Sequence, residues 1–300
     1  MTRGRRAFLS GVGAALGGAA LGCRGDGTGS GATPSAPKPA ASPGAPAASA
    51  GAIKVVTYNV LADADRARER FPALWSLLGA QEADIIALQE VTDWIARDLH
   101  GEPWAASYRV ATIDGAPARR GGQYVLTRAP SRDTAIVDLP GRQRRTALFT
   151  TVELPTGPIT VATTHAESFL EDGPTRAQQL EVIFGRLAGS GDALVLGDFN
   201  FGDGEPEEAR VPAEYVDLWR ALRPDEPGFT WDIERSEMAR VGSFPGEPSR
   251  RLDRIYLRSQ RTRGRSIEII GDQPVHPGRR ELFPSDHFGL AATLEPVSGS

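Results

Sequence analysis

The residues of this chain that could do chemistry stand at the ends of apolar stretches. Four such stretches, each typical of a buried β-strand, stop at a polar side chain: VVTY at Asn59, IIALQ at Glu90, VATT at His165 and LVLG at Asp198. The ends of buried strands are rigid positions that suit a catalytic set. We therefore expect these four side chains to contribute to one site.

Two further positions extend this set. Asn200 follows Asp198 by two residues, and the segment FPSDHFGL (283–290) places Asp286 beside His287 between apolar residues. Taken alone, an asparagine can simply form a turn, and an Asp-His pair can form a turn that leads into a half-buried strand. Taken together, the residues supply hard oxygen ligands and two imidazoles, which turns alone do not require.

These residue types favour metal-assisted chemistry on a phosphate. Mg²⁺ prefers carboxylate and water oxygens. A carboxylate can activate water, and an imidazole or imidazolium can stabilise charge on a pentavalent phosphate. The residues do not form a serine triad, and no glycine-rich phosphate loop precedes either lysine of the chain, Lys38 or Lys54.

Composition sets broad limits on the class of protein. With 300 residues and 40% hydrophobic content, the chain can build a full core but not several large domains. The formal net charge of −4 neither suggests nor excludes nucleic acid, because a local basic groove can coexist with an acidic total. The single cysteine, Cys23, excludes an internal disulfide and a cysteine-based zinc site.

The N-terminus predicts an export signal peptide over residues 1–23. Arg5 and Arg6 precede an apolar pair, as in twin-arginine signals, and a mild Gly/Ala stretch follows that is too short to span a bilayer stably. It ends in Leu-Gly-Cys, which resembles a bacterial lipoprotein box and predicts a lipid anchor at Cys23. The alternative is an ordinary signal peptide that contains a cysteine. Either way we expect an exported protein, and the anchor predicts a cell-envelope lipoprotein with the membrane as a partner.

Residues 24–52 are rich in Pro, Ala, Ser and Gly. Such a segment cannot bury enough apolar surface to fold, so it predicts a disordered tether. The catalytic domain is expected over 53–297, and we expect it to be a monomer.

The remaining pattern favours a layered α/β domain. Helical spacing of apolar residues predicts helices at 71–81 and 173–188, and a third helix after Glu90. Apolar runs predict strands at 53–60, 84–91, 121–128, 146–154, 159–166, 193–200, 252–259, 266–270 and from 288 onward. Strands outnumber helices, and helices separate some of them. This order predicts two sheets packed face to face.

Six short motifs occur in order along the domain: TYN (57–59), LQEV (88–91), TTH (163–165), GDFN (197–200), RLDRIY (251–256) and SDH (285–287). In this order they resemble the endonuclease/exonuclease/phosphatase superfamily. The resemblance implies a four-layered α/β sandwich, with two mixed, mainly antiparallel sheets packed face to face, helices outside and the site at one edge.

Other stretches are similar to the tyrosyl-DNA phosphodiesterase 2 branch of that superfamily, chiefly TTHAES (163–168), FTWD (229–232) and the Phe-Pro before SDH. Two positions depart from the branch: TYN replaces a Trp-Asn pair, and Gly202 stands where an arginine that helps to hold nucleic acid is expected. The resemblance implies a phosphodiester substrate in nucleic acid or in a 5′-linked DNA adduct.

The resemblance also implies metal-binding roles. Glu90 would be the main ligand of Mg²⁺, with Mn²⁺ as an alternative ion. Asn59 would help to position the metal, its water or the phosphate. Asp286 would act at or just outside the metal shell.

Catalytic roles follow in the same way. Asp198 would orient and deprotonate the attacking water, and Asn200 would hold that water or a phosphate oxygen. His287 would donate to the scissile phosphate, while Asp253 would fix its tautomer and raise its pKa. His165 would contact the phosphate from the opposite side.

Three residues are expected to contact the substrate: Trp231, Tyr58 and Ser168. Trp231 could stack on a base or on a tyrosyl leaving group. The alternative for Trp231 is a core or lid aromatic.

Two other functions stay open. One is a phosphatase or phospholipase that acts on lipid headgroups or small phosphoesters; an apolar loop able to enter a bilayer would support it, and the sequence shows none. The other is a binding module without catalysis, which is disfavoured because every expected motif position is filled.

Overall fold

The computed structural model describes residues 51–117 and 120–297. The predicted signal peptide, Cys23 and the tether up to residue 50 lie outside the described residues, so these predictions stay predictions. Within the described ranges, no helix is both long enough and apolar enough to cross a membrane.

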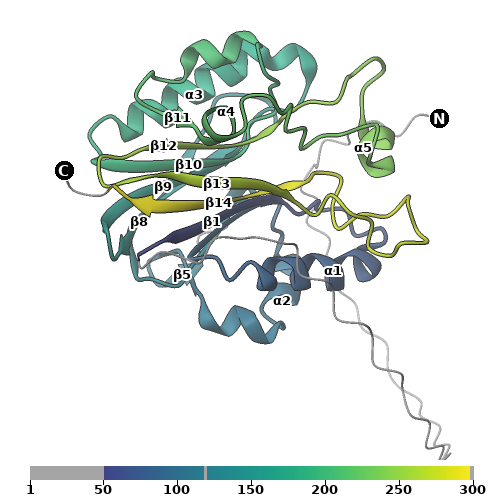
Figure 1. Ribbon diagram of the computed structural model, residues 1–300, viewed down its shortest axis with the longest axis horizontal. Helices are drawn as coiled ribbons and strands as arrows, with labels where there is room; N and C mark the ends of the chain where they lie inside the picture. Colours follow the sequence, from purple (N-terminus) through teal and green to yellow (C-terminus); the bar gives the residue numbers. More distant parts are fainter. Residues whose placement is uncertain (1–50, 118–119, 298–300) are drawn as a thin grey trace, which may run out of the picture. The chain divides into compact units, whose positions relative to one another are not determined.

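Two six-stranded sheets form the centre of the domain (Figure 1). The first has the strand order β13-β14-β1-β2-β6-β3, and the second has the order β11-β12-β10-β9-β8-β7. Strands β4 and β5 form a separate two-stranded pair. The strands are β1 Ile53–Asn59, β2 Ile85–Gln89, β3 Arg109–Val110, β4 Thr112–Ile113, β5 Ala116–Pro117, β6 Tyr124–Thr127, β7 Ser131–Asp138, β8 Thr146–Leu154, β9 Gly157–His165, β10 Asp192–Asp198, β11 Val216–Asp217, β12 Asp253–Arg258, β13 Thr262–Ile270 and β14 Gly289–Pro296.

Each large sheet contains one parallel pair of neighbours. Strands β1 and β2 are parallel in the first sheet, and β9 and β10 are parallel in the second. The other pairings are antiparallel. Because parallel strands end at the same edge of a sheet, each parallel pair brings two C-terminal ends together.

The main core fills the space between the two sheets. Its buried side chains come from both inner faces, for example Val55 and Ile85 from the first sheet and Val161 and Leu194 from the second. Near the end of β2 the interior becomes polar, and Gln89 Nε2 donates a hydrogen bond of 3.1 Å to Thr163 Oγ1 on the facing sheet. The two sheets are therefore linked by a buried hydrogen bond beside the predicted site.

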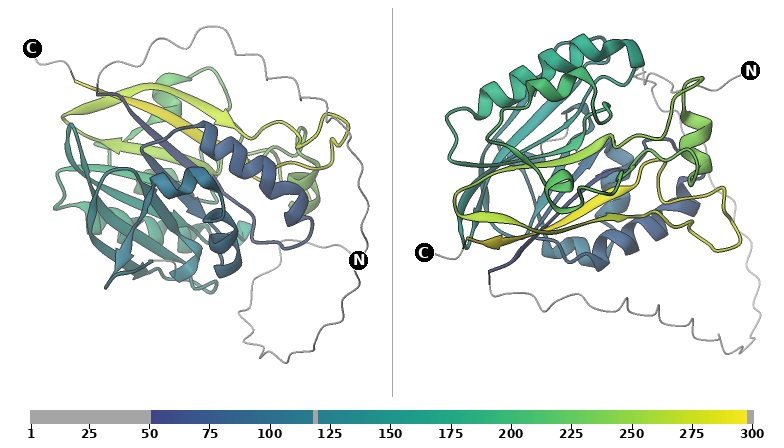
Figure 2. Two further views of the ribbon diagram at one scale, coloured as in Figure 1. Left: turned by 90° about the horizontal axis from the view of Figure 1, so that it is seen from below. Right: turned by 45° about the horizontal axis from the view of Figure 1, so that its top comes forward.

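Helices cover both outer faces, which gives four layers. Helices α1 (Ala67–Ala80) and α2 (Asp93–Leu99) bury apolar residues against the first sheet, and α3 (Gly173–Leu187) does so against the second (Figure 2). The short helix α4 (Leu218–Leu222) contributes Leu218 and Trp219 to the core between the sheets. Helix α5 (Glu237–Gly242) lies in the long connection before β12, and 3₁₀ turns include Pro103–Ser107, Leu170–Asp172 and Pro206–Arg210. The predicted fold class is confirmed.

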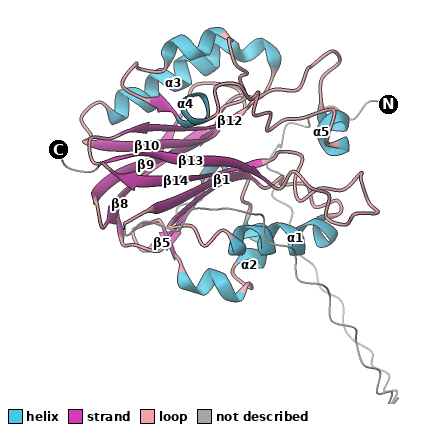
Figure 3. Ribbon diagram, in the orientation of Figure 1, coloured by secondary structure: helices cyan, strands magenta, loops and turns pink. Residues whose placement is uncertain are grey.

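The sequence located the buried elements better than the exposed ones. The predicted apolar face of α1 is correct, since Phe71, Leu74 and Leu78 are buried, although the helix begins at Ala67, earlier than predicted. Figure 3 shows the strands at the centre with helices outside them. Among these strands β7 was missed, because it is an edge strand in which no residue is fully buried. Edge strands need no continuous apolar run, so they carry little sequence signal.

Candidate active site

Three side chains from separate segments converge on the carboxylate of Asp198. Asn59 Nδ2 donates a hydrogen bond of 3.0 Å to Asp198 Oδ2. The same oxygen lies 3.3 Å from His165 Nε2 and 3.6 Å from His287 Nε2. Asp198 itself is fully buried, so these neighbours and not bulk water stabilise its negative charge.

Strand pairing explains this convergence. In the parallel pair β9–β10, His165 is in register with Asp198. In the antiparallel pair β10–β12, Asp198 faces Asp253, the first residue of β12. Asn59 ends β1 of the other sheet, next to Gln89 of β2. The predicted set therefore lies at one end of both sheets.

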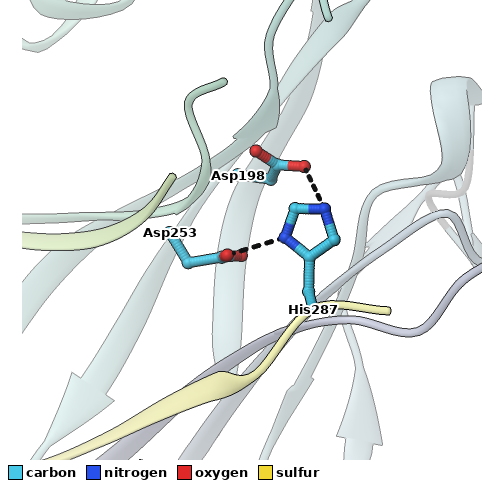
Figure 4. A group of neighbouring side chains, drawn as sticks. All are labelled: Asp198, Asp253 and His287. Atoms are coloured by element: carbon cyan, nitrogen blue, oxygen red, sulfur yellow. Dashed lines mark hydrogen bonds and ion pairs between the residues drawn. The ribbon is translucent and has the colours of Figure 1, made fainter. Parts of the chain in front are cut away.

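His287 and Asp253 form a buried hydrogen-bonded pair. His287 Nδ1 lies 2.8 Å from Asp253 Oδ2, and Asp198 approaches the other ring nitrogen (Figure 4). Burial alone would lower the pKa of His287, but Asp198 and Asp253 outweigh it and raise the pKa to about 10. Burial raises the pKa of Asp253 to about 6, against the opposing effect of His287. At neutral pH the pair is therefore an imidazolium beside a carboxylate.

Glu90 reaches the same cluster from the end of β2. Its Oε1 lies 3.3 Å from Asn59 Nδ2 and 3.7 Å from His165 Nδ1, and its Oε2 accepts a 2.8 Å hydrogen bond from the backbone N–H of Ala62. The side chain is 26% exposed, so it remains accessible to a ligand. Glu90 also has a φ of 64°, an uncommon conformation for a glutamate that is often found at functional sites.

Asn200 orients the turn that follows β10. It has a φ of 55°, its backbone N–H donates to Asp198 Oδ1 at 3.0 Å, and its Nδ2 donates to the carbonyl oxygen of Ala166 at 3.0 Å. These bonds join the chain after β10 to the chain after β9. They also fix the orientation of the Asp198 carboxylate.

The segment before β14 is tied to the end of β1. Ser285 Oγ donates to the carbonyl oxygen of Asn59 at 2.7 Å, and it lies 3.2 Å from Asp286 Oδ1. Asp286 is partly exposed, in contrast to His287. The two residues of the predicted Asp-His pair therefore have different environments: His287 belongs to the buried cluster, and Asp286 lies nearer to solvent.

The donor set fits a divalent cation. Ligand atoms of Asp198, Asp253 and His287 lie within 4.8 Å of one another. Within that group the close hydrogen bond between His287 and Asp253 already engages one atom of each residue. Glu90 Oε1 and Asp198 Oδ2 instead both accept from Asn59 Nδ2, which brings two carboxylates together and matches the preference of Mg²⁺ for hard oxygen ligands.

Trp231 is buried rather than open to a substrate. Its indole is fully buried, its Nε1 donates to Ser243 Oγ at 2.9 Å, and its ring centroid lies 4.9 Å from that of His287. The prediction that Trp231 stacks on a base or on a tyrosyl group is therefore wrong, and the alternative of a core aromatic is correct. Trp231 packs against the imidazole of His287 and supports its position.

Tyr58 is a second correction. Although it precedes Asn59, it is fully buried in the apolar cluster between the first sheet and the α1–α2 layer. Neighbouring residues in a strand point to opposite faces, so Tyr58 must point away from the site that Asn59 faces. We assign Tyr58 to the core and not to substrate binding.

Ser168 lies in the segment after β9 and contacts Gln143 of the loop between β7 and β8. Its Oγ lies 3.2 Å from Gln143 Oε1 and 3.0 Å from Gln143 Nε2. These bonds join two loops, and the predicted contact of Ser168 with substrate stays a prediction.

The sequence did not identify what holds the loop after Asn200. Arg251 of the RLDRIY motif is buried and contacts both Asp203 (2.5 Å) and Asp217 (2.8 Å). The space beside Gly202, where an arginine was expected, borders Arg250, whose side chain pairs with Glu205 at 3.1 Å and also with Glu247. The adjacent arginines at the start of this motif, Arg250 and Arg251, were the available signal for an anchoring role.

Comparison with known proteins agrees with this geometry. The chain is 27% identical to tyrosyl-DNA phosphodiesterase 2 of Mus musculus over 263 residues, which is 85% of this chain and 69% of the relative. It superposes on a crystal structure of D. rerio TDP2 complexed with single strand DNA product with a TM-score of 0.71 and 23% identity, over 82% of this chain and 100% of the other.

The human Nocturnin catalytic domain with bound sulfate shares the fold at lower identity, with a TM-score of 0.62 and 19% identity over 82% of this chain and 94% of that domain. The sequence profile of the Endonuclease/Exonuclease/phosphatase family matches residues 56–287, which include every site residue discussed above. The predicted resemblance is confirmed, and the chain is an enzyme of the hydrolase class. This chain belongs to the endonuclease/exonuclease/phosphatase family.

Proposed function

We propose that the chain is a Mg²⁺-dependent phosphodiesterase that hydrolyses phosphodiester bonds in nucleic acid or in a 5′-phosphotyrosyl-type DNA adduct. The observation that carries this proposal is the convergence of Asn59, His165 and His287 on the buried carboxylate of Asp198. Such a cluster can activate water and stabilise negative charge at the same place, which phosphoryl transfer requires.

In this mechanism Asp198 is the general base. It orients a water molecule and takes its proton as the water attacks phosphorus. The bond between phosphorus and the leaving oxygen breaks, and the leaving group departs with that electron pair as an oxyanion that solvent protonates. The backbone N–H of Asn200 holds Asp198 Oδ1, which leaves Oδ2 directed toward the two imidazoles.

His287 and His165 would contact the phosphate from two sides. The raised pKa of His287 keeps it protonated, so it can donate to a phosphate oxygen. Asp253 holds the ring through Nδ1 and leaves Nε2 directed toward the substrate side. Trp231 packs against the ring and limits its rotation.

Glu90 is the proposed main ligand of Mg²⁺, with Asn59 and Asp286 beside it. When bound, Mg²⁺ would offset the negative charge of the phosphate and lower the pKa of a coordinated water. Ala62 N–H and Asn59 Nδ2 hold the two carboxylate oxygens of Glu90 in place. Mn²⁺, which also accepts oxygen ligands, is the expected substitute.

The nature of the substrate is taken from the relatives. The mouse relative is named for tyrosyl-DNA, and the zebrafish structure holds a single-stranded DNA product. We propose the same substrate class here. Gly202 and the pairing of Arg250 with Glu205 and Glu247 leave the loop after Asn200 with a different charge distribution from the one expected for that class.

The test is a product analysis with the full chain and Mg²⁺. One reaction contains a single-stranded oligonucleotide with a 5′-phosphotyrosyl end, and the other contains the same oligonucleotide with a free 5′-phosphate. Release of tyrosine from an intact strand would support the adduct specificity. Shortened strands in both reactions would indicate a general nuclease, and no product in either would reject nucleic-acid substrates.

A second candidate, hydrolysis of lipid phosphoesters, is favoured by one observation. Leu170 and Val241 are large apolar side chains that are 44% and 58% exposed. Each lies close in sequence to one member of an aromatic pair, Phe169 and Phe244, whose ring centroids are 5.9 Å apart. The same assay with a phospholipid in vesicles distinguishes this candidate, which requires cleavage of a phosphoester bond of the lipid and no product from the oligonucleotide.

Replacing Asp253 with asparagine is expected to make catalysis more sensitive to alkaline pH. The negative charge of Asp253 helps to raise the pKa of His287, so its removal lowers that pKa. His287 would then lose its proton at a lower pH, so the alkaline limb of the pH–rate profile should move to lower pH. Turnover at neutral pH should fall by about 10²-fold or more, as is typical of acid–base groups.

The matched control is Asp192→Asn, a change at the opposite end of β10 in a carboxylate that pairs with Arg261. Its pH–rate profile should match that of the unchanged chain. An alkaline limb at the same pH in both variants would argue against the role of Asp253.

We also propose that the chain is exported and anchored through a lipid on Cys23. The support is the sequence alone: the arginine pair, the Gly/Ala stretch and the only cysteine at the end of a lipoprotein-like box. Cys23→Ser is expected to move the protein from the membrane fraction to the soluble extracytoplasmic fraction. An unchanged distribution of the variant between the two fractions would reject the anchor.

A further inference from the structure

A buried arginine lies beneath the site and takes no part in the mechanism above. Arg70 is in the first turn of α1, and its side chain is fully buried. It lies on the apolar face of the helix, four residues before Leu74. An arginine is rarely fully buried without a specific set of partners.

The partners of Arg70 are backbone carbonyl groups from two segments of the site. Its guanidinium donates to Val60 (3.3 Å), Leu61 (3.2 Å) and Asp63 (3.0 Å), which follow Asn59. It also donates to Pro284 at 2.8 Å, directly before Ser285, Asp286 and His287. Pro284 is 214 residues from Arg70 in sequence, and the one planar guanidinium joins its segment to the segment after Asn59.

Both segments hold residues of the proposed mechanism. Leu61 N–H donates to Asn59 Oδ1, and Ala62 N–H donates to Glu90 Oε2. Any shift of this segment therefore moves the amide of Asn59 and the carboxylate of Glu90. A shift at Pro284 moves His287, three residues later.

Backbone carbonyl groups accept hydrogen bonds from both terminal nitrogens of Arg70, whereas its buried Nε has no hydrogen-bond partner among the described residues. These carbonyl groups do not neutralise the charge of the guanidinium. Burial lowers the pKa of Arg70, whereas the carboxylates of Asp286, Asp63 and Glu90 raise it. Among the described residues, Arg70 forms no hydrogen bond or ion pair with a carboxylate. Its hydrogen bonds therefore hold the backbone of the two segments in place.

We propose that Arg70 is a positioning residue that holds the segment after Asn59 and the segment before His287 in one fixed geometry. This inference rests on the proposed function. It predicts that loss of the guanidinium separates the metal-binding side of the site from the phosphate-binding side. Such a displacement lowers turnover more than substrate binding, because a misplacement of about 1 Å can cost about 10²-fold in rate.

The chain offers a matched control in Arg258. This arginine also donates to three backbone carbonyls, those of Leu187 (2.8 Å), Ser190 (2.7 Å) and Gly191 (3.2 Å). It ends β12, whereas Asp253 of the site begins that strand. Arg258→Ala therefore removes a similar set of bonds away from the site.

The experiment compares Arg70→Ala, Arg70→Lys and Arg258→Ala in the full chain with Mg²⁺. For Arg70→Ala we expect kcat to fall about 10- to 100-fold with little change in KM, and we expect sub-denaturing guanidinium ion to restore part of it. Arg70→Lys keeps the charge without the planar fork, and it should retain more activity than the alanine variant. Arg258→Ala should keep its kcat and show no rescue.

A second readout does not depend on activity. Hydrogen exchange in the full chain should become faster in Arg70→Ala for peptides covering 60–66 and for peptides covering 283–288, and Arg258→Ala should leave both unchanged. If the unchanged chain has no phosphodiesterase activity but Arg70→Ala still exchanges faster in both segments, the positioning role is retained and the proposed function is rejected. Exchange that changes in neither segment or in only one, or a normal kcat for folded Arg70→Ala, would overturn the inference.

Discussion

Asp198→Asn is expected to lower turnover by about 10²- to 10⁴-fold, the usual contribution of a general base. The substitution keeps the size of the side chain but removes the negative charge that faces His165 and His287. It also introduces an amide beside Asn59 Nδ2, which in the unchanged chain donates a hydrogen bond to Asp198 Oδ2. The loss should therefore appear in kcat under saturating substrate and Mg²⁺.

The control for Asp198→Asn is Asp192→Asn in the same strand. Both residues belong to β10, but Asp192 begins the strand and pairs with Arg261. Its turnover should stay close to that of the unchanged chain. Equal losses in both variants would mean that β10 tolerates no change, and they would remove Asp198 from the mechanism.

His287→Ala is the second change with a large expected effect. It removes the proposed donor to the phosphate, and turnover should fall by about 10²- to 10⁴-fold. The fold should persist, because the apolar clusters that join the sheets and helices stay intact when the imidazole is removed. Turnover is measured together with the circular dichroism spectrum and the melting temperature.

His100→Ala provides the matched comparison. His100 contacts a buried side chain, since its Nε2 lies 2.6 Å from the hydroxyl of Tyr124, but it follows α2 on the outer layer of the domain. We expect no more than a small loss of activity there. A near-normal rate for His287→Ala would contradict the mechanism.

The sequence was sufficient to predict where most of the site lies. Asn59, Glu90, His165 and Asp198 each follow an apolar run, and parallel pairing brings the ends of those runs together. Asp253 has a different position, because it begins an antiparallel strand opposite Asp198. Strand direction cannot be read from an apolar run alone, so the motif and not the pattern identified Asp253.

Two errors had different physical origins. The error at Tyr58 was avoidable, since alternation along β1 places it on the face opposite to Asn59. The position of Trp231 was not readable from sequence, because it depends on the packing of distant segments around Ser243 and His287. Arg70 was missed because it precedes the predicted helix (71–81), whereas helix α1 begins at Ala67 and places Arg70 in its first turn.

The proposed metal-dependent activity is tested most directly with the p-nitrophenyl ester of thymidine 5′-phosphate, a phosphodiester with an aryl leaving group like that of tyrosine. The full chain and Asp198→Asn are each treated with a chelator, dialysed and assayed before and after addition of Mg²⁺. The unchanged chain should release p-nitrophenol only with Mg²⁺, and Asp198→Asn should release almost none. Release that persists without metal, or that is equal in both proteins, would contradict the proposed mechanism.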